Sequence, residues 1–275
     1  MSDLRNRQLS HLQGFEDALE QSEQAVLRNF ATRLVDFEQH MGSVFTRYED
    51  AEGQLTRAVM SRHGRQVKLD QALRGITVNL YAESTRIVTS AINASYVNGF
   101  QGTTEVVRRT WGQNSLIGIL RQEELHRAAT NEISGLAWTK RLNLHREAAV
   151  AHIRETIVQG IHRGESYAQM ARRLNEVLGT DTVNTLRIIR TECYRVFSEA
   201  KKDRLDRVAG IDMTKEWITS KDESVRKNHK VMHGVKVPYN MNFKLPNGNE
   251  GFAPGMIGAA ADDINCRCFW VVDMA

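Results

Sequence analysis

The sequence predicts a mainly α-helical protein that ends in a small α+β domain, with long helices followed by a short antiparallel sheet. All three prolines, Pro238, Pro246 and Pro254, come after residue 237. Because proline interrupts helices, the proline-free part permits long uninterrupted ones. Apolar residues in that part recur at steps of three and four, which is the spacing of one helix face. After Gly210 this spacing gives way to short strand-like runs and glycine-rich loops, so we expect a different architecture there.

The first predicted helix covers about residues 9–59 and carries a heptad-like apolar seam. An apolar stripe of this length on one helix needs a partner surface. We predict that it docks on a larger assembly or on copies of the same chain. An antiparallel hairpin within the chain, or an ordinary bundle helix, accounts for the same spacing. The residues of the seam are Leu27, Phe30, Leu34, Phe37, Met41, Val44 and Tyr48.

Further helices are predicted over residues 67–111, 116–137, 142–161 and 181–208. A short helix precedes the last of these, between the N-cap residue Ser166 and Gly179. Helix–turn–helix DNA readers share this layout, but the sequence lacks their recognition-helix signature. We divide the chain into an elongated helical region, residues 1–160, with a coiled-coil-like first helix, and a second domain, residues 161–275, which is helical to about residue 210.

The segment 211–275 is predicted to form the α+β tail of the second domain. Runs rich in β-forming residues predict strands at 215–220, 235–237 and 266–272. Asp222 is a suitable N-cap for a helix that reaches Met232, and Gly234 follows where a C-terminal glycine belongs. We therefore expect a small antiparallel sheet of two to four strands beside a short helix.

Composition indicates an ordinary soluble protein. The chain has 275 residues, of which 41% are hydrophobic and 25% charged. No apolar run approaches the length of a membrane span, and the N-terminus lacks the apolar stretch of a secretory signal. We expect synthesis in the cytoplasm and no membrane partner. Three cysteines do not make a disulfide framework, so reduced thiols are expected.

Charge is unevenly distributed along the chain. Residues 1–60 carry a balance of −4, residues 61–210 a balance of +8, and residues 211–275 are neutral. A basic middle permits non-specific contact with nucleic acid through phosphate groups. Solvated helix faces explain the same residues equally well. The candidate DNA contacts are Arg108, Arg109, Arg172, Arg173, Lys201 and Lys202.

A set of motif residues in the last third of the chain resembles the Mu F-like minor head proteins of tailed bacteriophages, which are also called head morphogenesis proteins. The resemblance covers about residues 160–275, and its residues are specific as a set rather than singly. They are Arg190, Glu192, Trp217, Asp222, Arg226, His229, Gly234, Asn265, Cys266, Arg267 and Cys268.

The resemblance implies a minor capsid protein that lies inside the head at the portal vertex. Its partners would be the portal protein, the capsid proteins, copies of itself and, non-specifically, packaged DNA. It would assist head assembly and DNA packaging or ejection, without enzymatic activity. Some relatives carry a toxin domain after the shared region. Because this chain stops shortly after Cys268, we expect no such cargo.

Four side chains in the tail form a candidate zinc site. His229 and His233 are four residues apart on a predicted helix, and Cys266 and Cys268 alternate on a predicted strand, so each pair shares one side. Two imidazoles and two thiolates suffice for tetrahedral zinc. The alternative is a metal-free core, with buried cysteines, His229 hydrogen-bonded to backbone, Asp222 or Asp263, and Arg267 paired with a carboxylate.

A second functional hypothesis is a nucleic-acid-cleaving or toxin-like effector carried in the virion. Glu192, Arg226 and His229 are the residue types of an acid–base pair with an anion-stabilising cation. Neither a phosphate-binding loop nor a nucleophile motif accompanies them. The structural alternative is a buried network of Arg190 and Glu192 that fixes the helix to the tail.

Overall fold

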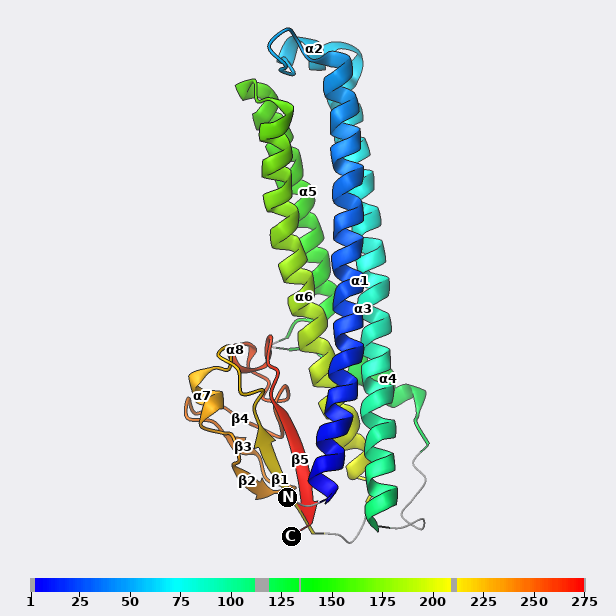
Figure 1. Cartoon of the computed structure of the whole chain (residues 1–275), viewed down its shortest axis with the longest axis vertical. Helices are drawn as coiled ribbons and strands as arrows, with labels where there is room; N and C mark the ends of the chain where they lie inside the picture. Colours follow the sequence, from blue (N-terminus) through cyan, green and yellow to red (C-terminus); the bar gives the residue numbers. More distant parts are fainter. Residues whose placement is uncertain (1–2, 112–118, 134, 209–211, 275) are drawn as a thin grey trace. The chain divides into compact units, whose positions relative to one another are not determined.

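The computed structural model describes residues 3–111, 119–133, 135–208 and 212–274. Long helices and a small antiparallel sheet are both present, which confirms the predicted fold class (Figure 1). The helices are α1 Asp3–Tyr48, α2 Arg57–Ser61, a short 3-10 helix Arg62–Gly64, α3 Arg65–Trp111, α4 Gln122–Thr130, α5 Trp138–Arg163, α6 Tyr167–Leu205, α7 Lys227–Lys230 and α8 Ala260–Asp263. The strands are β1 Met213–Ile218, β2 Lys236–Pro238, β3 Phe243–Lys244, β4 Glu250–Gly251 and β5 Phe269–Met274. Among the described helices, none combines the length and apolar character that a membrane crossing requires.

The chain forms two compact units, and both are discontinuous in sequence. Unit 1 comprises Met1–Glu23, Val88–Trp138 and Arg187–Ala275, and unit 2 comprises Gln24–Ile87 and Thr139–Leu186. This division differs from a single boundary near residue 160, because α1, α3 and α6 each contribute residues to both units. Local periodicity reports that a helix is long, but it does not report where along the helix the packing partner changes.

In unit 2 the apolar seam of α1 packs against helices of the same chain. Phe30, Phe37 and Met41 are all buried, and the ring of Phe30 meets the edge of Tyr81 in α3. The Asn29 side-chain amide donates to the carbonyl of Leu80, 3.0 Å away. The prediction that these three residues dock on an outside partner is therefore wrong. The antiparallel hairpin within the chain accounts for the seam, and only Leu27 at its start is exposed.

Asp181 of unit 2 gives a pH-dependent stability prediction. Burial raises the pKa of this carboxyl from 3.8 to about 6, against the smaller opposing effect of the Tyr81 hydroxyl, and its Oδ2 makes no well-formed hydrogen bond with a described residue. A carboxyl whose pKa is higher in the folded than in the unfolded chain loses stabilisation as pH rises from about 4 to 6. We expect Asp181→Asn to raise the free energy of unfolding by about 1–2 kcal/mol at pH 7.5, in line with the cost of an unsatisfied buried group. The gain should vanish near pH 4, as measured by urea unfolding at both pH values. A gain of equal size at both would contradict the assignment.

The tail of unit 1 is built on a three-stranded antiparallel sheet of order β2-β1-β5 (Figure 1). Trp217 of β1 lies opposite Trp270 of β5, and both indoles are fully buried. A separate pair, β3 and β4, covers the end of the sheet that holds Trp217, through the ring of Phe243. The predicted boundary at Gly210 falls outside the described residues.

Several predicted elements differ from the observed ones. The short helix predicted between Ser166 and Gly179 is part of the continuous helix α6. The strand expected from Cys266 begins only at Phe269, because Asn265 adopts a positive φ of 57° that turns the chain. Of the helix predicted over residues 116–137, Gln122–Thr130 is helical, and residues 116–118 lie outside the described part. Short elements depend on tertiary packing more than on local pattern, so their ends are hard to place.

Gln8 of α1 and Lys201 of α6 cover the open edge of β5. The Gln8 carboxamide accepts from the backbone N–H of Val272 at 2.9 Å and donates to the carbonyl of the same residue at 2.8 Å. Lys201 donates to Gln8 Oε1 at 2.8 Å and to the carbonyl of Trp270 at 2.7 Å. The side chain of Lys201 is buried, and burial lowers its pKa well below the ordinary value. The prediction that Lys201 contacts DNA is therefore wrong, since this ammonium group caps an exposed strand edge.

Candidate metal centre

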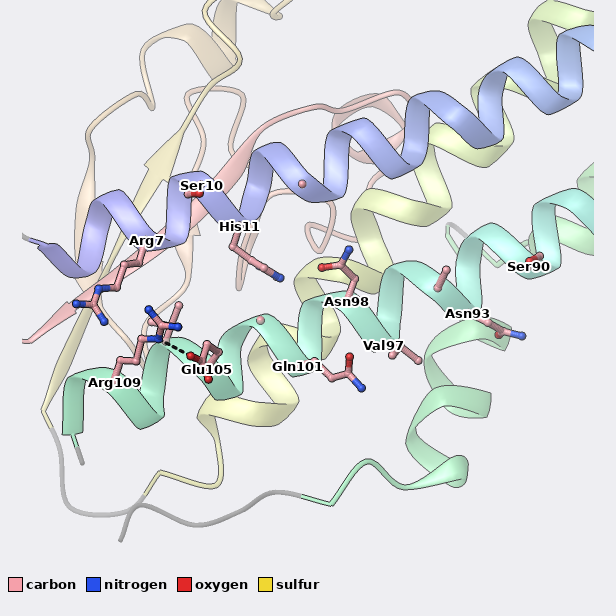
Figure 2. Close-up of a pocket in the computed structure, with 14 residues that line it drawn as sticks. Arg7, Ser10, His11, Ser90, Asn93, Val97, Asn98, Gln101, Glu105 and Arg109 are labelled. Carbon is pink, nitrogen blue, oxygen red and sulfur yellow. Dashed lines mark hydrogen bonds and ion pairs between the residues drawn. The ribbon is translucent and has the colours of Figure 1, made fainter. Parts of the chain in front are cut away.

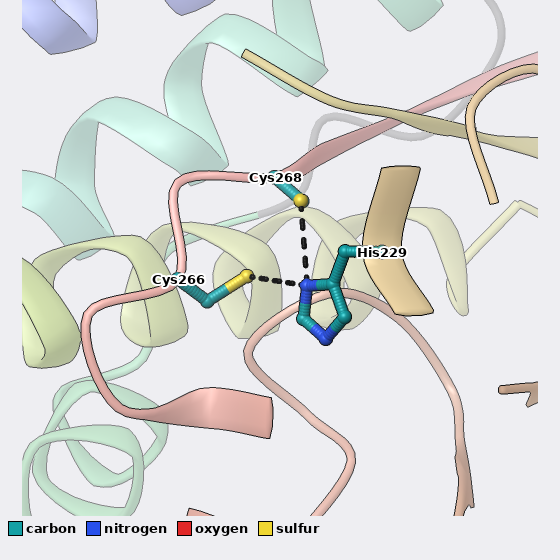
Figure 3. Close-up of side chains that lie close together, drawn as sticks. All are labelled: His229, Cys266 and Cys268. Carbon is teal, nitrogen blue, oxygen red and sulfur yellow. Dashed lines mark hydrogen bonds between the residues drawn. The ribbon is translucent and has the colours of Figure 1, made fainter. Parts of the chain in front are cut away.

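Three of the four predicted zinc ligands lie together in unit 1. His229 Nδ1 is 3.6 Å from the Sγ atoms of both Cys266 and Cys268 (Figure 3). The three ligand atoms lie within 4.8 Å of one another, and all three residues are buried. His229 comes from α7, whereas the cysteines lie in the segment between α8 and β5. The positive φ of Asn265 turns this segment, and the Asn265 N–H donates to Thr191 Oγ1 at 2.8 Å.

His233 does not belong to this cluster. Its Nδ1 accepts from the backbone N–H of Thr219 at 3.1 Å. The pairing of His229 with His233 assumed a helix through residue 232, but α7 ends at Lys230 and a turn leads to Gly234 at φ 82°. Without another helical turn, residues four apart do not share a face. Within the described part of the chain the candidate ligand set therefore has three members.

A carboxylate holds the other nitrogen of the His229 ring. Asp262 Oδ1 lies 3.3 Å from His229 Nε2, and both side chains are buried. Three asparagine amides donate to the same carboxylate, from Asn228 at 2.7 Å, Asn249 at 2.7 Å and Asn247 at 3.1 Å. Burial would raise the pKa of Asp262, but these hydrogen bonds outweigh it and hold the pKa below 3.8. Asp262 therefore stays an acceptor and orients the imidazole.

The two thiols do not titrate alike. Hydrogen bonding with Cys268, together with burial, raises the pKa of Cys266 well above 9.0. The same hydrogen bond lowers the pKa of Cys268. For His229, burial alone lowers the pKa, but hydrogen bonds with Cys266 and Asp262 raise it above 6.5. The hydrogen bond between the two sulfurs therefore shifts the pKa values of the two thiols in opposite directions.

Aromatic side chains enclose the cluster. The indole of Trp217 meets the His229 ring edge-to-face at a centroid distance of 5.2 Å, and meets Phe243 at 5.3 Å. Trp217, Phe243 and Cys268 belong to one apolar core. The motif tryptophan thus forms a wall of the candidate site and part of the core beneath it.

The remaining motif residues hold the tail together, and Arg190 also attaches it to α6. Arg190 pairs with Glu23 at 2.8 Å and also donates to Asn265 Oδ1 at 3.3 Å. Arg267 pairs with Asp222 at 2.7 Å, which confirms the expected carboxylate partner. Separately, Arg226 donates to the carbonyls of Asp262 and Ile264, and Gly234 donates to the carbonyl of Trp217 at 2.8 Å. These contacts are those of an architectural motif.

Glu192 belongs to a buried ionic cluster with Arg195 and Glu199. Arg195 donates to Glu192 at 2.8 Å and to Glu199 at 3.0 Å, and all three side chains are at most 5% exposed. The expected network of Arg190 with Glu192 is therefore wrong, because Arg190 pairs with Glu23 instead. Of the residues that the nuclease hypothesis combines, Glu192 pairs with Arg195, Arg226 donates to backbone carbonyls, and His229 lies against the carboxylate of Asp262.

Most of the candidate DNA contacts already have an acidic neighbour. Arg108 and Arg109 both pair with Glu105 on the exposed face of α3. The other ion pairs are Arg173 with Glu165 at 2.9 Å and Lys202 with Asp206 at 2.5 Å. Arg172 is exposed, and the described residues give it no acidic partner. Most of these side chains are therefore charged groups on helix surfaces that are already paired with an acidic residue.

A groove between α1 and α3 was not predicted from the sequence. Its volume is about 1080 Å³, and Arg7, Ser10 and His11 face residues of α3 across it (Figure 2). A Cβ atom added at Gly102 would lie 1.6 Å from His11 Nε2, so only glycine leaves room for this ring. The His11 ring also stacks on Phe197 of α6. The groove lies in unit 1 and is separate from the His229 cluster.

The residues that sequence reasoning missed are the partners of the motif. Asp262, rather than Asp222 or Asp263, holds His229. The asparagines at 247 and 249 flank Gly248 in the loop between β3 and β4. A clue lay in the run Asn247-Gly248-Asn249 ahead of the paired aspartates Asp262 and Asp263, but no local rule assigns which carboxylate the amides reach.

Residues 151–271 match the family described as Phage Mu protein F like protein. The chain is 26% identical over 262 residues to Minor head protein GP7 of Bacillus phage SPP1. This alignment covers 94% of this chain and 84% of that protein. It is 31% identical over 138 residues to NAD(+)--arginine ADP-ribosyltransferase EFV of Enterococcus faecalis, covering 50% of this chain but 28% of the transferase. No solved structure matches.

Proposed function

We propose, from the premise that this chain belongs to the Mu F-like minor head proteins and functions in phage head morphogenesis, that it binds the portal vertex on the inside of the head. The observation that supports this most is the extent of the alignment with the SPP1 minor head protein, which includes the helical part as well as the Mu F-like region. A chain that shares both parts shares a whole architecture, and we infer that it shares a place in the particle.

The geometry favours an architectural role. Arg190, Arg226 and Arg267 of the motif are engaged in ion pairs and backbone hydrogen bonds, so they fix the tail. The protein acts as a structural component of the virion rather than an enzyme. The transferase relative gives no reason to add its named activity, because the alignment covers 28% of its length.

We place the contact with portal or capsid on exposed faces of the helices, because Phe30, Phe37 and Met41 of the α1 seam are buried by the chain itself. Contact with packaged DNA would be non-specific and weak, since most basic candidates are already paired. In this proposal the protein assists head assembly and DNA packaging or ejection by its position at the vertex.

Heads assembled without portal protein test the proposal. We expect the chain to be present in complete heads and to fall to background in portal-less heads of the same preparation, because its binding site would be missing. Quantitative immunoblotting, normalised to the major capsid protein, measures this. The variant Val231→Ala, which changes only an exposed position, is the control for mutation as such and should be incorporated like the wild-type chain. Equal amounts per head with and without portal would show binding to the shell instead.

A further inference from the structure

We propose that His229, Cys266 and Cys268 bind one zinc ion through Nδ1 and the two Sγ atoms, with a fourth position for a small ligand. The inference rests on the distances between the ligand nitrogen and the two ligand sulfurs. With Zn–N distances of about 2.0–2.1 Å, Zn–S distances of about 2.3 Å and tetrahedral angles, a ligand nitrogen and sulfur lie about 3.6 Å apart. His229 Nδ1 lies 3.6 Å from each sulfur. Both separations are those of ligands around a common centre (Figure 3).

The hydrogen bond on the other side of the ring selects the required tautomer. Asp262 faces Nε2 and accepts its proton, so the lone pair of a neutral imidazole lies on Nδ1, between the two sulfurs. A carboxylate behind a ligating histidine is the arrangement that zinc sites use to orient the ring. The three amide donors of Asn228, Asn247 and Asn249 fix that carboxylate in turn.

A metal-free cluster satisfies these groups less well. A single nitrogen that lies equally far from two sulfurs has only one lone pair or one hydrogen to offer, so it forms a good hydrogen bond with only one of them. A bound cation engages the nitrogen and both sulfurs at once. The cluster therefore has the symmetry of a coordination site rather than of a donor–acceptor pair.

The space beside the cluster fits a fourth ligand of the size of water. A cavity of about 10 Å³ is lined by His229, Cys266 and Cys268, with Ser220 and Arg226 also on its wall. A volume of roughly 10–15 Å³ holds one water molecule. Three protein ligands plus water complete a four-coordinate site.

Such an ion would join segments that have little regular structure of their own. His229 lies in a four-residue helix, and both cysteines lie in the turn before β5. Binding energy at a site formed only in the folded chain adds to folding stability. This inference concerns the stability of the tail and does not depend on where the protein sits in the head.

The metal content of the full chain, expressed and purified without chelators, tests the proposal. We expect one zinc per chain by mass spectrometry of the elements, and loss of that zinc in Cys268→Ser and in His229→Gln. The matched control is His233→Asn, because His233 lies four residues from His229 but outside the cluster, and Asn keeps an acceptor for Thr219. This control should retain the zinc. Zinc lost from His233→Asn as fully as from Cys268→Ser would overturn the three-residue ligand set.

Cobalt binding by the wild-type chain gives a readout that does not rely on variants folding. After removal of the metal by chelation, Co²⁺ should produce thiolate-to-cobalt charge-transfer absorption and the visible bands of a tetrahedral ion. Restoring zinc should abolish these bands and raise Tm by several degrees. Wild-type protein that contains no more zinc than Cys268→Ser and gives no thiolate band with Co²⁺ would overturn the proposal.

Discussion

Replacing Arg195 with methionine is expected to lower the free energy of unfolding by about 3–5 kcal/mol, because it leaves two buried carboxylates without their shared cation. Arg195 pairs with Glu192 and Glu199 on α6 and donates to the carbonyl of Ala128 at 2.6 Å. Glu192 is fully buried, so water cannot replace the guanidinium. Methionine keeps most of the side-chain volume, which separates the loss of charge from the loss of packing. Chemical denaturation followed by circular dichroism measures the effect.

The control for this experiment is Arg127→Met. Arg127 pairs with the same Glu199 at 2.8 Å, but its side chain is 55% exposed. An exposed ion pair contributes at most about 1 kcal/mol, so this variant should stay near wild type. Adding Glu192→Gln to Arg195→Met should recover part of the loss, since it removes one of the two buried charges that Arg195 neutralises. Equal, small effects of Arg195→Met and Arg127→Met would mean that the cluster is hydrated and not buried as described.

Replacing Trp217 with alanine is expected to cost about 3–5 kcal/mol, the usual range for deleting a large buried aromatic side chain. The indole is fully buried between the His229 ring and Phe243, and it belongs to the core that holds both cysteines. Its removal would leave a cavity beneath the candidate metal centre. Thermal and urea unfolding, followed by circular dichroism, measure the loss.

Two further variants distinguish a loss of core packing from a general sensitivity of the tail to substitution. Trp217→Phe keeps an aromatic wall and should cost clearly less than Trp217→Ala. Val231→Ala, at the end of α7, changes a side chain that is 62% exposed and should stay within about 0.5 kcal/mol of wild type. If Trp217→Ala and Val231→Ala unfold at the same denaturant concentration, the tail core does not depend on this indole.

The helical character was predictable because the chain has no proline before residue 238 and keeps a three–four apolar spacing. The spacing showed that the α1 seam must be covered, but not by what. Phe30, Phe37 and Met41 are covered by the same chain, and the same pattern serves an intermolecular coil. Partner identity is a property of the tertiary fold, which local periodicity does not contain.

The candidate site was predicted in part for a similar reason. Cys266 and Cys268 were predicted to share one side of a strand. That strand begins only at Phe269, yet both sulfurs lie beside His229 Nδ1 because the chain turns at Asn265. The choice between His229 and His233 depended on one helical turn that the structure lacks. Lys201 and Lys202 show the same limit, because adjacent residues on a helix point about 100° apart, so one is buried while the other reaches solvent.

The closure of the β5 edge by Gln8 has a consequence for how the protein is made. These two partners, Gln8 and Val272, are 264 residues apart, so α1 emerges from the ribosome long before the strand that it covers. Unit 2, which ends at Leu186, is fully synthesised while much of unit 1 is still to come. Because contacts between distant residues form slowly, we expect unit 2 to fold first during translation and unit 1 to close last. Newly made chains would thus pass through a stage in which the first helix is built but its sheet is not.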